Sequence, residues 1–90
     1  GRITLAAATA RFEKVVAADP GTFWDWIELS RLYQQQLALA KASTAADRAI
    51  AAAKSKRDRM VGLSKSGDIL RARRNSGEAF NRFNECLAIA

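Results

Sequence analysis

The chain has 90 residues and a formal net charge of +6, from 15 Lys and Arg against 9 Asp and Glu, so its length is that of one domain. With no His and one Cys, the composition excludes a disulfide framework, a His- or Cys-rich zinc site and catalysis by an imidazole base. No apolar run approaches the ~18–20 residues of a membrane-spanning helix.

The residue types favour helices throughout. Ala, Leu, Arg, Lys, Glu and Gln dominate, and no stretch alternates apolar and polar residues as a half-buried strand does. The first predicted helix spans 3–18, with Phe12 and Val16 on its apolar stripe. Pro20 and Gly21 end it, since Pro cannot continue a helix and Gly permits the turn. The fold class predicted is therefore all-α, with about five helices.

The second predicted helix begins near Phe23, after Thr22 as its N-cap, and Trp26 belongs to its inner stripe. Its end is open, because no Gly or Pro occurs from 34 to 60. One interpretation places the break at 35–38. The alternative places it at Ser43-Thr44. The third helix follows and is rich in Ala, so another helix must pack close to it.

The fourth predicted helix starts at 56–58, with Ser55 as its cap, and ends at 73–74. Asn75 to Gly77 form a turn, and Ser76 is the expected cap of the last helix, which continues to the end of the chain. That uncapped end and the absent initial Met suggest a piece of a longer protein.

Three segments share one spacing. Ala8 is followed four residues later by Phe12, and Ala79 by Phe83, while Ala42 is followed by Ala46. Two further sets lie at matching distances upstream of the second and third of these. They are Trp26, Leu29, Ser30 and Tyr33, and Leu63, Ser66, Gly67 and Leu70.

This pattern resembles the tetratricopeptide repeat, W-x2-L-G-x2-Y followed by A-x3-F. The resemblance implies antiparallel helix pairs stacked as a short right-handed solenoid. Residues 1–21 would be the second helix of one repeat, and 22–55 and 56–90 two full repeats. Four positions depart from the pattern: Ala46 replaces an aromatic residue, Leu37 and Arg74 replace Gly, and Lys54 replaces Pro. The alternative is an unrelated Ala-rich helical bundle.

The resemblance also implies a concave groove, lined by the first helix of each pair, that binds a peptide segment of a partner protein. The groove residues expected here are Trp24, Ile27, Glu28, Arg31, Gln35, Ser64, Lys65 and Asp68. The Lys and Asn set with which some members grip a C-terminal carboxylate is absent, so binding of chaperone tails is not expected. The leading functional hypothesis is a protein-interaction scaffold.

Basic residues concentrate in the second half of the chain. The candidate basic patch comprises Lys54, Lys56, Arg57, Arg59, Arg71, Arg73 and Arg74. A solvated helix face is the simplest interpretation, and an acidic protein partner is the second. Nucleic acid is the third, because a basic stripe alone gives non-specific, salt-dependent affinity. No aromatic residues interleave with these charges, which makes nucleic acid the weakest of the three.

A second class of function is self-association through an apolar end face on the last helix, formed by Phe80, Phe83 and Leu87. It would produce a homodimer or a helix swap, because end repeats need polar caps in water. An enzyme is not expected, nor a cofactor or metal. Cys86 is expected to be a buried core thiol. One unpaired Cys and no visible signal suggest the cytoplasm.

Overall fold

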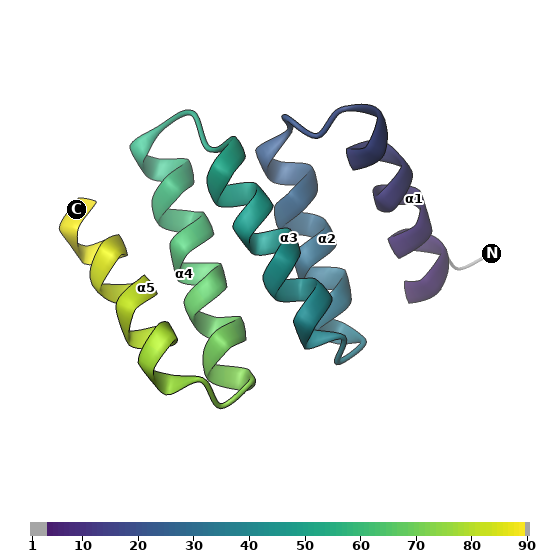
Figure 1. The fold of residues 1–90 in the computed structure, drawn as a ribbon. Helices are drawn as coiled ribbons and strands as arrows, with labels where there is room; N and C mark the ends of the chain where they lie inside the picture. Colours follow the sequence, from purple (N-terminus) through teal and green to yellow (C-terminus); the bar gives the residue numbers. More distant parts are fainter. Residues whose placement is uncertain (1–3, 90) are drawn as a thin grey trace.

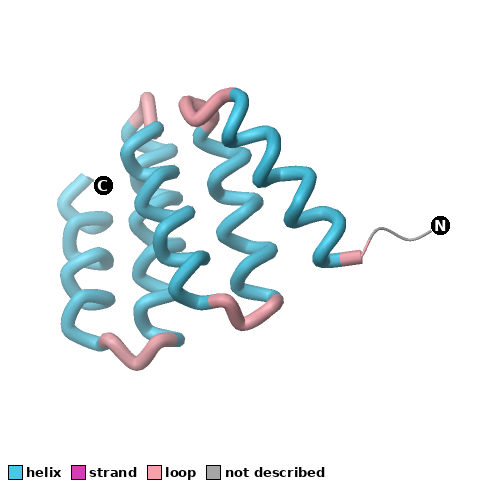
Figure 2. Tube along the Cα trace, turned by 45° about the vertical axis from the view of Figure 1, so that its right-hand side comes forward, coloured by secondary structure: helices cyan, strands magenta, loops and turns pink. Residues whose placement is uncertain are grey.

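The computed structural model describes residues 4–89, which form five helices and no strand (Figure 1). The prediction of an all-α chain with about five helices is thus confirmed. The helices are α1 (Leu5–Ala18), α2 (Phe23–Gln35), α3 (Leu39–Ala52), α4 (Lys56–Ala72) and α5 (Ser76–Ile89). The connecting loops alternate between the top and the bottom of the helices, so consecutive helices run antiparallel (Figure 2).

The break between the second and third helices lies where the first interpretation placed it. α2 ends at Gln35 and α3 begins at Leu39. The alternative break was wrong, since Ser43 and Thr44 lie inside α3. Thr44 cannot cap a helix there, because its hydroxyl donates to the Ala40 carbonyl at 3.2 Å.

Two of the predicted caps differ from expectation. Thr22 stands at the N-cap of α2, but its hydroxyl donates to the Asp19 carboxylate instead of accepting from α2. Ser76 is the first residue of α5, and the side-chain oxygen of Asn75 accepts from the Glu78 amide at 3.4 Å in its place. The Ser55 cap is confirmed, because its hydroxyl oxygen accepts from the backbone N–H of α4 at 3.0 Å.

The two turns that end α2 and α4 have the same construction. Leu37 and Arg74, which stand where the repeat pattern has Gly, adopt φ of 60° and 61°. The next residue in each case donates back across the turn at 2.9 Å, from Ala38 to the Tyr33 carbonyl and from Asn75 to that of Leu70. These are the bonds of a helix-ending motif that places one residue in the left-handed region. The chain therefore repeats this turn 37 residues later.

The core follows the row of helices. Each helix packs on the next, and α2 also contacts α4. Leu29 is 2% exposed and lies with Val16 and Ala45 in one cluster, against which the rings of Phe12 and Trp26 pack. The indole N–H of Trp26 donates to the carbonyl of Pro20 at 2.8 Å, as a half-buried Trp requires. α3 presents its buried Ala side to these neighbours, which permits the close approach expected from its sequence.

α4 and α5 pack closely at Gly67. A Cβ atom at this position would lie 2.6 Å from the Phe83 ring, inside van der Waals contact. The ring therefore occupies the space that any larger residue at Gly67 would take. In the α2–α3 pair the equivalent residues are Ser30 and Ala46, and the Ser30 hydroxyl donates to the Ala42 carbonyl at 3.0 Å.

Two buried serines should respond oppositely to the same substitution. Ser30 and Ser66 are both 0% exposed, but only Ser30 has a hydrogen-bond partner. Ser30→Ala should lower the free energy of unfolding by about 1 kcal/mol, the net value of a hydrogen bond. Ser66→Ala should leave it unchanged or raise it, because it removes an unsatisfied hydroxyl. Urea unfolding of both variants measures the difference, and equal losses would contradict the assigned hydrogen bond.

Candidate functional site

A cleft of about 450 Å³ lies along α2 and α4, where these two helices meet. Its walls combine apolar and charged side chains from both helices and one from α5. They are Ile27 and Arg31 of α2, Met60, Val61, Ser64, Lys65 and Asp68 of α4, and Cys86 of α5. A concave apolar surface with a few polar groups is the usual form of a binding site in proteins.

Most of the predicted groove residues meet in this cleft. Ile27, Arg31, Ser64, Lys65 and Asp68 line it. Glu28 does not line it but is bonded to Arg31. Trp24 and Gln35 lie outside its lining. Trp24 is 56% exposed and packs edge-on against Phe23, with ring centroids 4.9 Å apart.

Two charged side chains of the cleft, Arg31 and Lys65, form hydrogen bonds with neighbouring side chains. Arg31 donates from two nitrogens to Glu28, and this hydrogen bonding lowers the pKa of the Glu28 carboxyl. Lys65 donates to the side-chain oxygen of Gln34 at 2.8 Å. Partial burial lowers the pKa of the Lys65 ammonium, and the nearby Asp68 and Glu28 carboxylates oppose only part of that effect. Lys65 forms no ion pair within residues 4–89, so it is the cation best placed to meet an incoming acidic group.

One residue of the cleft was assigned to the core by the sequence. Cys86 was expected to be a buried core thiol. Cys86 is only half-buried, and its thiol donates to the Met60 carbonyl at 3.5 Å. Cys86 lines the cleft because no further helix covers this part of α5 among the described residues, and sequence spacing does not reveal such an opening.

The basic residues do not form one patch. Lys56, Arg57 and Arg59 lie in the first turn of α4, while Arg71, Arg73 and Arg74 lie at its far end. The two groups are separated by most of a 17-residue helix, about 20 Å at 1.5 Å per residue. Arg71 is also engaged, since it forms an ion pair with Asp68 at 3.2 Å and lies 5.9 Å from the centre of the Phe83 ring.

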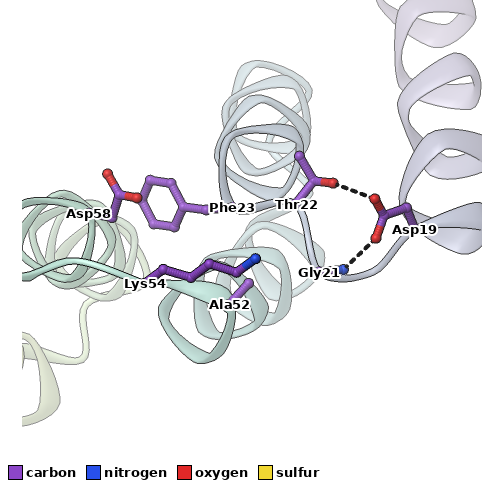
Figure 3. A pocket seen from close by; sticks show the side chains of 7 residues that line it. All are labelled: Asp19, Gly21, Thr22, Phe23, Ala52, Lys54 and Asp58. Atoms are coloured by element: carbon purple, nitrogen blue, oxygen red, sulfur yellow. Dashed lines mark hydrogen bonds between the residues drawn. The ribbon is translucent and has the colours of Figure 1, made fainter.

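Lys54 precedes Lys56 by two residues and lines a hollow of about 310 Å³ near the start of α2, together with Asp58 of the first turn of α4 (Figure 3). Its side chain extends toward the residues that join α1 to α2. There the Asp19 carboxylate accepts from the Gly21 amide and the Thr22 hydroxyl, each at 3.1 Å. Lys54 thus lies between this turn and the start of α4, and the expected basic patch is divided between the two ends of α4.

The proposed self-association face is only partly exposed. Phe80 is 65% exposed and Leu87 is 71% exposed, as expected. Phe83 is half-buried, because its ring lies against Gly67. The exposed apolar surface of α5 is therefore smaller than the sequence predicted and consists of Phe80 and Leu87.

Tyr33 connects α2 to α1 and is the one tyrosine of the chain. Its hydroxyl donates to the Glu13 carboxylate, and burial together with this bond raises the pKa of Tyr33 to about 12 from its ordinary 10.0. The folded state then holds the proton more tightly than the unfolded state. Stability from this group is complete below pH 10.0 and is lost as the pH rises through about 12.

Tyrosinate absorbance should therefore report a folded-state midpoint near 12 and a midpoint near 10.0 in urea. Glu13→Gln removes the negative charge, so the midpoint should fall part of the way and stay above 10.0, because burial is the larger cause. A midpoint near 10.0 in the folded protein would contradict the Tyr33–Glu13 contact.

Among the residues described, no group of three or more His, Cys, Asp or Glu could hold a metal ion. Within residues 4–89, no helix combines the length and apolar character needed to cross a bilayer. No family model matches the chain, and comparisons with curated proteins and with solved structures gave no significant match.

Proposed function

We propose that the chain is a protein-interaction scaffold of the tetratricopeptide type, which binds an extended segment of a partner protein in the α2–α4 cleft. The observation that carries the proposal is the composition of this cleft. Side chains from the first helices of two successive pairs meet there, with Ile27 and Val61 as apolar walls and Lys65 as a charged contact. Such a surface suits a peptide with apolar and acidic side chains.

On this proposal, α2–α3 and α4–α5 are two successive repeats, and α1 is the second helix of a preceding one. Together they form a short right-handed solenoid. Three features support this arrangement. The turns at Leu37 and Arg74 share their hydrogen bonds. α4 packs on both helices of the preceding pair. Ala42 and Ala79, at equivalent positions, are both buried.

The test is selection of binders from a randomised peptide library displayed on phage, followed by affinity measurement with cleft variants. Ile27→Asp and Val61→Asp should each weaken a selected peptide at least about tenfold, a loss of about 1.4 kcal/mol. Lys65→Ala should weaken peptides that carry acidic residues. Leu37→Asp is the matched control, because Leu37 is 81% exposed and lies outside the cleft. Peptides that lose affinity equally with all the Asp variants would contradict the proposal.

A second candidate function is self-association through α5, which the exposure of Phe80 and Leu87 favours. An apolar pair of this kind at one end of a helical row would be covered in a homodimer. Light scattering on a size-exclusion column at several protein concentrations tests it. Phe80→Asp should turn a dimer into a monomer, and a wild-type chain that stays monomeric throughout would exclude this candidate.

A further inference from the structure

A second hollow, of about 330 Å³, lies on α2 and α3, away from the α2–α4 cleft. The rings of Trp26 and Tyr33 contribute to it from α2, and α3 contributes Ala40, Lys41, Thr44 and Ala45. α1 borders it, because Tyr33 donates its hydroxyl to Glu13. Both aromatic side chains remain partly accessible there, although they pack against the core cluster.

The chain contains the same arrangement a second time, and there a hollow of about 280 Å³ is lined by the polar residues Glu78, Asn81, Arg82 and Glu85 and by no aromatic ring. In α5, Arg82 stands where α3 has Ala45, and it reaches across to Asp47 of α3 at 3.8 Å. The residues equivalent to Trp26 and Tyr33 are Leu63 and Leu70, which are buried. Between α1 and α3 the acidic residue is present as Glu13, but Ala45 is too short to reach it.

The charges that flank this position have opposite signs on α5 and on α3. On α5, Arg82 lies between Glu78 and Glu85. On α3 the equivalent residues are Lys41 and Arg48, which lie on one face of the helix because they are seven positions apart. Both are exposed, and neither forms an ion pair among residues 4–89.

We propose that this hollow is a docking site for an acidic peptide segment that inserts one bulky apolar side chain between Trp26 and Tyr33. Charge complementarity selects the acidic partner, since Lys41 lines the apolar opening and Arg48 lies two turns later on the same face of α3, while Glu13 is bonded to Tyr33. The two cations lie about 10 Å apart along α3, at 1.5 Å per residue. About three residues of extended chain span that distance, which a peptide covers and a single ring does not.

The probe is a synthetic peptide of four glutamates around one phenylalanine, titrated into the uniformly labelled protein and followed by NMR. The Trp26 indole N–H signal should shift in a saturable manner. Lys41→Glu and Arg48→Glu should each weaken the peptide at least about fivefold. Arg57→Glu makes the same change of charge at a distant site and should alter affinity less than about twofold. A peptide with alanine in place of phenylalanine should bind more weakly.

Three results would overturn the proposal. The first is a Trp26 signal that does not shift at millimolar peptide. The second is an equal loss of affinity in Lys41→Glu, Arg48→Glu and Arg57→Glu, which would indicate attraction to net charge alone. The third is loss of binding in Lys65→Glu with Lys41→Glu unaffected, which would assign the peptide to the α2–α4 cleft.

Discussion

Leu29→Ala should lower the free energy of unfolding by about 2–5 kcal/mol, the range for a large-to-small substitution in a packed core. Leu29 is 2% exposed and lies in one cluster with Val16 and Ala45, so its side chain joins α1, α2 and α3. Its removal would leave a cavity that these backbones can close only partly. The total free energy of unfolding of a domain is about 5–15 kcal/mol, so this loss would be a large part of it.

Urea unfolding followed by helical circular dichroism measures this loss. Leu37→Ala is the matched control, because it removes the same atoms from a side chain that is 81% exposed. It should change stability by less than about 0.5 kcal/mol. Similar losses in the two variants would mean that Leu29 does not join the three helices.

Gly67→Leu should destabilise the chain by about 1–3 kcal/mol, because the Phe83 ring already occupies the space beside Gly67. The better helix propensity of Leu offsets part of this cost, by roughly 0.5–1 kcal/mol. The net loss should therefore fall in the lower part of the range.

A double-mutant cycle isolates the contact. Phe83→Ala alone should destabilise by loss of packing, and Gly67→Leu combined with Phe83→Ala should be more stable than the sum of the two single losses predicts. A coupling of at least about 1 kcal/mol is expected for residues in direct contact. Additive losses would contradict the packing of Phe83 on Gly67 and, with it, the assignment of Phe83 to the interior.

The sequence predicted the helices well because their stripes and stops are local properties. Pro20 and Gly21 ended the first helix, and Ser55 capped the fourth. The region after α2 has no Gly or Pro to mark the end of the helix, so two interpretations stayed open. The turn is made by Leu37 in a left-handed conformation, which Leu rarely adopts and which the sequence therefore does not predict. Thr22 stands at the N-cap of α2 as predicted, but its hydroxyl donates to Asp19 and does not cap the helix, and Asn75 accepts the hydrogen bond that was expected for Ser76.

The candidate site could be predicted only in part, for a physical reason. Helical spacing assigns a residue to a face, but the neighbouring helix decides how much of that face is covered. Ile27 and Lys65 line the α2–α4 cleft, whereas Trp24 lies outside its lining. The inward position of Phe83 depends on the missing side chain at Gly67, which lies on a different helix. The division of the basic residues follows from the length of α4.

The most direct test of the scaffold proposal uses a phage-selected peptide carrying a spin label, with the protein labelled at its methyl groups. We predict that the methyl signals of Ile27, Val61 and Met60 broaden on binding, while those of Leu37 and Leu87 do not. That result would place the peptide in the α2–α4 cleft. Broadening confined to Leu87, with Ile27 and Val61 unaffected, would contradict the proposal and move the binding surface to α5.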